Sequence, residues 1–473
     1  MSQQHRIAAI RRSQGLARIA LKVLVVLLAL AVVLGGVWTY YNVKWGRELT
    51  KELEAWKAQG LPLSMSEVIP KPVPDSENAA PIYLSVFHVS FDPNSGPAGV
   101  NTGKLADISQ EEENLIEDYR RGRDRPKHVA KVRAILERPE VKETLQTLKR
   151  ASQRPKAVFP VKWELGLAAV LPHMAQFRDA TRMLAAQALL LAEDGQMADA
   201  LDWCLVGLRM ADHAAMEPSM IAQLVSIAMR NITLEAVEEI ISDKNVPAAA
   251  SRALQEHLRG IDLYKTHSDA MVMETLVGRS VFAQFRTNPV LLYETLIGEK
   301  TEHLRKLRRS YFNWLAGPLR GLDEATYLRI MRQQVEASRM PGMEAKPVSD
   351  ALDRQLRQTP LAMLTKILTP VFSGQAYHRG MSLARIDLGR IALALKAYKA
   401  QHGQYPQTLA QLQQTLTWQL PKDVFTGEDF VYKREGDGFV IYSLGPDLDD
   451  DQGTEAEKPS PDADGDIAWR AKK

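Results

Sequence analysis

The hydrophobic pattern of the chain starts with one uninterrupted apolar run, from Val23 to Tyr41. The run carries no charge, is apolar throughout its first fifteen positions and ends in Trp38, Tyr40 and Tyr41. As a helix it would be about 28 Å long, close to the ~30 Å hydrocarbon core of a bilayer. Aromatic side chains at one end are typical of the headgroup boundary. The pattern therefore predicts a transmembrane helix over 23–41.

The charges on the two sides of this run differ. Acidic and basic residues are mixed after it, whereas no acidic residue precedes it and the basic residues there are Arg6, Arg11, Arg12, Arg18 and Lys22. By the positive-inside rule, 1–22 is a cytoplasmic tail and the rest of the chain lies across the membrane. A cleaved signal peptide has the same charge order. However, no Ala-x-Ala-like site follows, and the run is long for a signal peptide, so an intact anchor is favoured.

Beyond the membrane the pattern changes twice before residue 109. Apolar residues at three- and four-residue steps predict a juxtamembrane helix over 42–60, which Gly60-Leu61-Pro62 ends. Three prolines within 69–74 then predict a stiff, extended spacer. A short helix over Ala79–Phe87 follows it. The stretch 61–108 is thus predicted to be a Pro-rich linker with one short helix.

The next 260 or so residues show helical periodicity and no convincing strand pattern. Proline and Asp-Gly breaks separate the segments, which predicts an all-α domain over 109–375. The predicted helices are Glu111–Arg121, Val129–Leu136, Lys142–Ser152, Met174–Glu193, Met197–His213, Met220–Ile241, Ala248–Leu258 and Glu324–Met340.

One pair of these helices resembles a tetratricopeptide hairpin. Bulky and small residues alternate across Leu184–Gly207 in the order that lets two antiparallel helices approach closely around Asp194-Gly195. The pattern does not recur 34 residues later, because Leu234 stands where Ala200 would repeat. A single tetratricopeptide-like hairpin in a helical bundle is favoured, with a wider helical-repeat architecture as the alternative.

The segment 300–322 interleaves basic and aromatic residues. Its basic residues include Arg305, Lys306, Arg308, Arg309 and Arg320, and its bulky apolar residues include Leu307, Tyr311, Phe312, Trp314 and Leu315. A helix of this kind can lie on an anionic membrane surface. The alternative is a solvated basic face with the aromatic residues in the core, and this interpretation is favoured.

Composition and motifs exclude several classes of function. The net charge is only +3, so no nucleic-acid partner is predicted, and the single cysteine, Cys204, permits no intrachain disulfide. The sequence contains no HExxH, CxxC or Gly-x-Ser-x-Gly motif. His173 and His213 lack a metal-ligating partner on their own helices and are expected to be structural. No catalytic residue is predicted, and the chain is not expected to be an enzyme.

The C-terminal stretch, 376–473, has a different pattern. A heptad stripe predicts an amphipathic helix over Ser382–His402, and Gly403 ends it. Two β-rich runs, 430–432 and 439–442, are separated by Glu435-Gly436-Asp437-Gly438 and predict a hairpin. A tail dense in Asp and Gly follows.

These 90 or so residues resemble the globular domain of the major pseudopilin of type II secretion systems. The segments that carry the resemblance, in order, are 395–398 (LKAY), 403–406 (GQYP), Leu409, 420–423 (LPKD), 426–427 (TG), 441–447 (IYSLGPD) and 464–467 (DGDI). The resemblance implies a helix packed on a small antiparallel sheet, and an acidic loop that binds Ca²⁺. The chain departs from that family at its apolar run, which lacks the family's early glutamate and is separated from the domain by more than 300 residues.

The acidic loop is the one candidate metal site. Nine carboxylates lie between Asp447 and Asp466, against Lys458 alone, and such a density of like charge favours a bound cation. Oxygen ligands and glycines suit calcium rather than zinc. The resemblance implies as ligands the Leu444 carbonyl and the carboxylates of Asp447, Asp464 and Asp466. The alternative is a solvated acidic tail.

The expected fold is therefore mainly α, with a transmembrane helix, a large helical domain and a small pseudopilin-like α+β domain. The chain as a whole also resembles large single-pass envelope proteins of bacteria. We expect a protein of the bacterial inner membrane with its bulk in the periplasm, acting as a scaffold or interaction protein for other envelope proteins. The alternative is an accessory component of a type II secretion or type IV pilus-like assembly.

Overall fold

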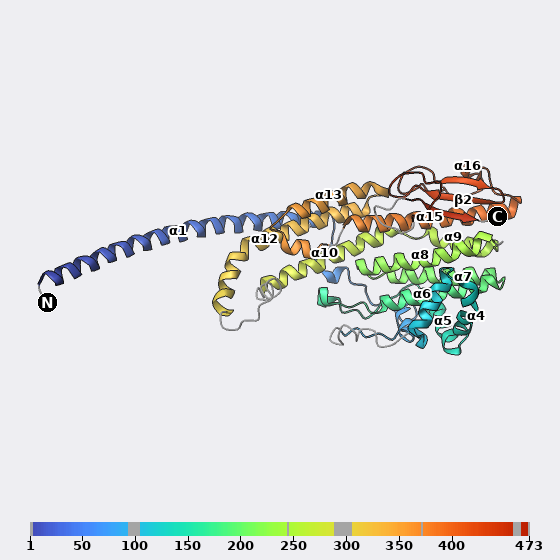
Figure 1. The fold of residues 1–473 in the computed structure, drawn as a ribbon, viewed down its shortest axis with the longest axis horizontal. Helices are drawn as coiled ribbons and strands as arrows, with labels where there is room; N and C mark the ends of the chain where they lie inside the picture. Colours follow the sequence, from blue (N-terminus) through green and yellow to red (C-terminus); the bar gives the residue numbers. More distant parts are fainter. Residues whose placement is uncertain are drawn as a thin grey trace. The chain divides into compact units, whose positions relative to one another are not determined.

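The computed structural model describes residues 3–92, 105–243, 246–287, 305–369, 372–456 and 465–471 (Figure 1). Helices hold 69% of the residues and strands 5%, which confirms the prediction of a mainly helical chain with a small C-terminal sheet. The chain divides into two compact units. Unit 1 comprises 1–61, 281–330 and 356–369, and unit 2 comprises 62–280, 331–355 and 370–473. The domain boundaries expected from the sequence remain a prediction.

Unit 1 is built around one long helix, α1 (Gln3–Ala58). The predicted tail, transmembrane helix and juxtamembrane helix are therefore parts of a single continuous helix. Within its segment from Arg18, the most apolar window of 18 residues has a mean hydropathy of 2.7, and none of that window is buried. This helix is a candidate membrane span. Met220–Ser242 of unit 2 is also long and apolar enough, but 61% of its window is buried in the protein, as in a core helix.

Unit 1 also contains residues 281–287, which end the helix α10 (Leu263–Thr287), and two further helices, one in part and one whole. The helix α12 (Arg305–Arg339) runs beside α1, with Gly317 facing Trp38 and Gly321 facing Trp45. The short helix α14 (Met363–Leu368) is held on α12 by Asp323, whose carboxylate accepts hydrogen bonds from the backbone N–H groups of Leu364 (2.9 Å) and Thr365 (3.0 Å). A carboxylate at a helix N-terminus satisfies donors that have no partner within the helix.

The helical part of unit 2 is centred on three mutually packed helices, α6 (His173–Glu193), α7 (Met197–Ala215) and α8 (Met220–Asp243). The turn between α6 and α7 uses Gly195 at φ +80°, which fits the predicted Asp194-Gly195 turn. The tetratricopeptide assignment itself stays a prediction. The other described helices that lie wholly or mainly in this unit, in chain order, are α2 (Ala80–Leu84), α3 (Gln110–Arg120), α4 (Arg125–Leu136), α5 (Pro139–Ser152), α9 (Ala248–Arg259), α10 (Leu263–Thr287), α13 (Ala345–Gln358), α15 (Phe372–His402) and α16 (Leu409–Gln413). Four 3-10 turns, Met65–Glu67, Leu105–Asp107, Trp163–Ala168 and Gly342–Glu344, lie between them.

The C-terminal sheet has three antiparallel strands in the order β1 (Val431–Glu435), β2 (Gly438–Ser443) and β3 (Ile467–Ala471). The predicted hairpin is present, with Glu435 opposite Gly438. All six residues of the central strand β2 are buried. The sheet packs on α15 and also on α8, so this end of the chain shares its core with the helices of unit 2.

Candidate cation site

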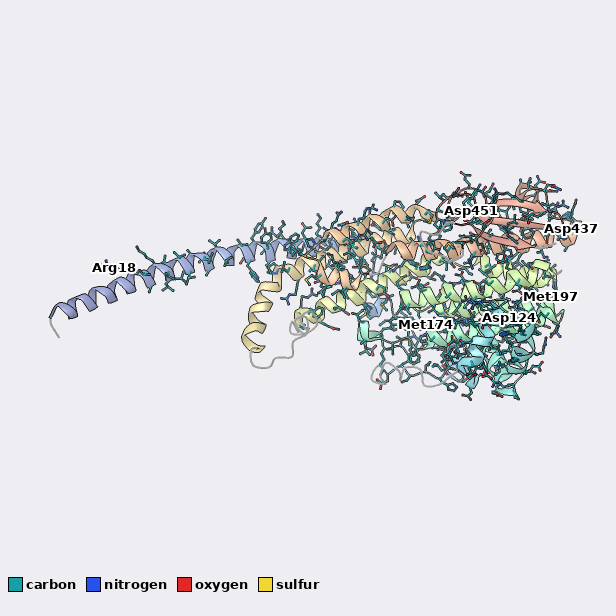
Figure 2. All side chains as sticks on the ribbon, viewed as in Figure 1. Arg18, Asp124, Met174, Met197, Asp437 and Asp451 are labelled. Atoms are coloured by element: carbon teal, nitrogen blue, oxygen red, sulfur yellow. The ribbon has the colours of Figure 1, made fainter. Side chains whose placement is uncertain are left out.

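The predicted ligand residues lie where the chain leaves β2 and where it enters β3. Figure 2 shows Asp451 at one end of the sheet, with Asp437 of the hairpin turn at the other. At the Asp451 end, the N–H of Gly465 donates a hydrogen bond to Asp447 Oδ2 (2.9 Å). A Cβ atom added to Gly445 would lie only 3.0 Å from the Gly465 carbonyl oxygen. The segments that carry Leu444, Asp447 and Asp466 are thus brought together, and Asp464 lies outside the described residues.

Asp466 is the buried carboxylate of this site. Its side chain belongs to a residue that is 3% exposed, and its Oδ2 accepts a hydrogen bond from the N–H of Gly453 (2.6 Å). Its Oδ1 is buried with no hydrogen-bond partner in the described part of the chain. Burial raises the pKa of Asp466 to about 6, and the nearby negative charges of Asp450, Asp451 and Asp447 act in the same direction. A buried carboxylate with a vacant oxygen favours a cation beside it.

The surrounding loop is held in place by its own carboxylates. Asp450 Oδ1 accepts hydrogen bonds from the hydroxyl of Tyr442 and from the N–H of Gln452, both at 2.9 Å. Asp447 uses Oδ2 for Gly465, while its Oδ1 receives only a long contact of 3.4 Å from the N–H of Asp449. In both Asp447 and Asp466, one carboxylate oxygen is thus fixed by a backbone donor and the other is left for a ligand.

The chemical type of these ligand atoms suits calcium. They are oxygens alone, and calcium takes six to eight oxygen ligands from carboxylates, carbonyls and water. Among the described residues, however, no group of three or more His, Cys, Asp or Glu is placed to hold a metal ion. The described chain therefore supplies two carboxylates and the loop backbone. A complete coordination shell would need further oxygen ligands, from Asp464 or from water.

The two histidines of the helical part differ. His213 is hydrogen-bonded on both ring nitrogens, by Nδ1 to the Tyr83 hydroxyl and by Nε2 to the Arg154 carbonyl, each at 2.9 Å. Burial lowers the pKa of His213, so the ring is held neutral. This is the structural role expected from the sequence.

His173 forms a buried pair with Glu217, which the sequence did not predict. Its Nε2 lies 3.7 Å from Glu217 Oε1, and the two side chains are 0% and 1% exposed. Neither ring nitrogen of His173 and neither carboxylate oxygen of Glu217 has a hydrogen bond within the described residues. The ring of Phe159 stacks on His173 with its centroid at 4.0 Å. Because the two residues come from different elements, their spacing in the sequence gives no signal.

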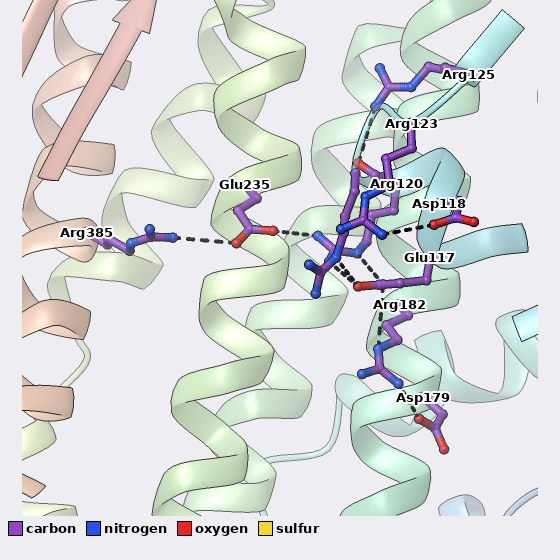
Figure 3. Close-up of polar contacts among 10 residues, drawn as sticks. Glu117, Asp118, Arg120, Arg123, Arg125, Asp179, Arg182, Glu235 and Arg385 are labelled. Atoms are coloured by element: carbon purple, nitrogen blue, oxygen red, sulfur yellow. Dashed lines mark hydrogen bonds and ion pairs between the residues drawn. The ribbon is translucent and has the colours of Figure 1, made fainter. Parts of the chain in front are cut away.

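A network of charged side chains ties four helices of unit 2 together (Figure 3). At its centre Arg120 of α3 donates to Glu117 through Nε (2.9 Å) and Nη2 (2.8 Å) and to Glu235 of α8 through Nη1 (2.5 Å). Arg182 of α6 lies 3.6 Å from Glu117, and Arg385 of α15 lies 3.6 Å from Glu235. Burial acts to raise the pKa of Glu117, but its bonds to Arg120 and Arg121 outweigh it and lower that pKa to about 2. The acidic and basic groups of this network pair with one another, as in a structural network.

A cleft of about 500 Å³ lies between α15, the 3-10 turn at Gly342–Glu344 and the loop before β1. Apolar side chains such as Leu383 and Phe425 line it, together with Asp387 and Lys422. Burial raises the pKa of Asp387 to about 6, although Arg390 donates to it at 2.6 Å. The cleft is a second place where unit 2 could accept a ligand.

In comparisons with known proteins, no family model, no curated protein sequence and no solved structure matches this chain. The resemblance to the pseudopilin domain therefore rests on the sequence segments given above.

Proposed function

We propose that this chain is a membrane-anchored scaffold of the bacterial envelope, with α1 crossing the inner membrane and unit 2 in the periplasm. The observation that carries the proposal is the apolar face of α1, which is exposed along Ile19–Leu34 and preceded by basic residues alone. An exposed apolar helix of this length suits a lipid environment. The basic flank then sets the orientation.

An interaction role is supported by the surface of unit 2. Ile221 and Leu224, one turn apart at the start of α8, are 61% and 42% exposed. Elsewhere in unit 2 the described charged network is engaged in holding helices together. Exposed apolar side chains on an otherwise packed helical unit suit contact with another protein. The expected partners are other envelope proteins, and no catalytic step is assigned to the chain.

The C-terminal sheet contributes a calcium-stabilised module in this proposal. Asp447 and Asp466 supply carboxylate oxygens, the Leu444 carbonyl closes the loop, and Asp464 completes the ligand set that the pseudopilin resemblance implies. The vacant Oδ1 of the buried Asp466 supports this assignment. Calcium would neutralise the acidic loop and fix the entry into β3.

The proposal is tested in two steps. Alkaline phosphatase fused after Gly60 should be active and a green fluorescent protein fused there should be dark, and the reverse result would overturn the orientation. A photoreactive amino acid at Ile221 should then crosslink in intact cells to a distinct envelope protein. The same probe at the exposed Arg252 of α9 should not. Equal labelling at both positions would argue against a defined interaction surface.

The second candidate is an accessory role in a secretion or pilus-like assembly. The order of a long helix, a three-stranded antiparallel sheet and an acidic loop between β2 and β3 favours it. In this chain, however, α15 and β3 also pack on α8, so the helix and sheet are partly covered within the protein. Co-purification with pseudopilins from native membranes would support this role over that of an independent scaffold.

A further inference from the structure

The helix α12 meets α1 where the apolar span ends. A Cβ atom added to Gly317 would lie 3.2 Å from Trp38 Cζ2 and 3.5 Å from Asn42 Oδ1. One turn later, a Cβ atom on Gly321 would lie 3.3 Å from the Cβ atom of Trp45. Residue numbers rise together in the two helices, so α12 runs parallel to α1. The residues of α12 before Gly317 therefore start from the level of Trp38, at the membrane boundary.

A proline at this point changes the course of α12. Pro318 lies inside the helix, where its ring clashes with the carbonyl four residues earlier and one backbone hydrogen bond is lost. In Figure 1 the first part of α12 turns aside from α1. A straight continuation would have carried the twelve residues 305–316 about 18 Å along α1 into the apolar span. Four basic residues would then have entered the hydrocarbon, which is costly.

The sequence of this turned segment is that of a surface-lying helix. Positions 307, 311, 314 and 315 follow the i, i+4, i+7, i+8 spacing of one helical face and are Leu, Tyr, Trp and Leu. Arg305, Lys306 and Arg309 fall elsewhere around the helix, whereas Arg308, seven residues before Leu315, borders the apolar face. No acidic residue occurs between 303 and 322. Leu319, directly after the bend, is 47% exposed. Such a helix carries both the apolar face and the positive charge that an anionic bilayer surface binds.

We propose that residues 305–317 of α12 form an interfacial helix that lies on an anionic bilayer surface beside the end of the α1 span. The proposal rests on the membrane anchoring proposed above. It reverses the interpretation favoured from the sequence, in which the aromatic residues were expected in the core. Its basis is the contact of Gly317 with the end of the span and the bend at Pro318, neither of which the sequence pattern reveals.

The proposal is tested with single-cysteine variants of the full chain in a Cys204→Ala background. Each carries an environment-sensitive fluorophore and is reconstituted into vesicles of phosphatidylcholine with or without 30% phosphatidylglycerol. Labels at Leu28 in α1, at Leu315, at Arg309 and at the exposed Glu256 of α9 are compared for quenching by spin-labelled lipid and by iodide. Glu256 is the aqueous control.

In vesicles that contain phosphatidylglycerol, the label at Leu315 should be quenched by lipid several-fold more than the label at Arg309, and that at Glu256 by iodide alone. Replacing Arg305, Lys306, Arg308 and Arg309 by Gln should abolish the dependence on phosphatidylglycerol. If the label at Leu28 is quenched by lipid while that at Leu315 is shielded from both quenchers, the segment lies in a protein core and this inference fails alone. If the label at Leu28 escapes lipid quenching, the membrane anchor fails as well.

Discussion

Gly389 of α15 lies directly under the ring of Trp469 in β3. A Cβ atom on residue 389 would approach Trp469 Cζ3 to 2.9 Å and Leu234 Cδ2 of α8 to 3.3 Å. The last strand thus meets both its own helix and the helical core at a point that only glycine leaves free. This contact is one of those by which the C-terminal sheet packs within unit 2.

Substituting Gly389 by Ala should therefore destabilise the chain. Overpacking a tight contact costs about 1–3 kcal/mol, more than the roughly 1 kcal/mol that alanine gains in helix propensity. Gly374 is a matched control on the same helix, since a Cβ atom there would meet nothing within 4 Å. Urea unfolding of the two alanine variants compares them directly, and equal stability of both would show that the sheet does not press on α15.

Calcium should stabilise the full chain more at pH 7 than at pH 5. Asp466 has a raised pKa of about 6 in the folded chain, above its ordinary value of 3.8. The folded state thus binds more protons between these values, and without a cation its stability falls as the pH rises through that window. A cation opposes this loss by competing with the proton. The melting temperature with calcium and with EDTA, measured at both pH values, checks the prediction.

Asp466→Asn provides the control for that experiment. It keeps the size of the side chain but removes the titrating charge, so both the calcium effect and the pH dependence should shrink. A solvated acidic tail predicts instead the same melting temperature in calcium and EDTA at either pH, in wild type and variant alike.

Arg120→Ala should cost roughly 2–4 kcal/mol, since it breaks a buried ion pair whose partners retain some access to water. The arginine side chain is 3% exposed, whereas that of Glu117 is 20% exposed. Arg123→Ala is the matched control, because its side chain is 64% exposed and makes one ion pair among the described residues, to Asp118 at 3.3 Å. That control should cost at most about 0.5 kcal/mol.

The same variant should alter the acid sensitivity of the chain. The pKa of Glu117 is lowered to about 2 in the folded state from an ordinary 4.5. Its contribution to stability is therefore present above pH 4.5 and is lost as the pH falls toward 2. Without Arg120 this loss should be smaller, and an unchanged acid-unfolding profile would contradict the assignment.

The buried pair of His173 and Glu217 predicts strong coupling between two substitutions. His173→Phe or Glu217→Leu alone leaves one buried polar group without its partner. Each single substitution should lower the free energy of unfolding by about 3–5 kcal/mol. The double variant removes both groups, so it should be more stable than either single variant. Denaturant unfolding in a double-mutant cycle measures the coupling, and additive costs would show that the two side chains do not interact.

Helices and strands were predicted best from the sequence where the pattern that defines them spans only a few neighbouring residues. The helices α6, α7 and α8 and the β1–β2 hairpin lie within a few residues of the expected bounds, because apolar spacing and turn glycines act over a few residues. The helix α10 was not predicted. Gly278 and its β-branched residues lower intrinsic helix propensity, and the packing of Met273 and Val277 on Trp163 supplies the missing stability.

Long-range pairings were beyond the sequence pattern. The strand β3 was not expected, since five residues after an acidic tail become a strand only by pairing with β2, where Ile467 lies opposite Ser443. The carboxylates of the candidate cation site were predicted through the pseudopilin resemblance. The burial of Asp466 and the pairing of His173 with Glu217 depend on segments far apart in the chain, and no single-sequence pattern encodes them.

Unit 1 carries a consequence for the order in which the protein folds. Its three segments are separated by residues 62–280 and 331–355, so α1 can pack on α12 only after more than half of the chain has been made. Bringing the ends of an excursion of that length together costs roughly 5 kcal/mol of chain entropy, which favours folding of the intervening stretch first. The contact of Trp38 with Gly317 would thus be among the last to form. A chain cut short before residue 281 would keep its candidate membrane span and lose α12, which packs beside the end of that span.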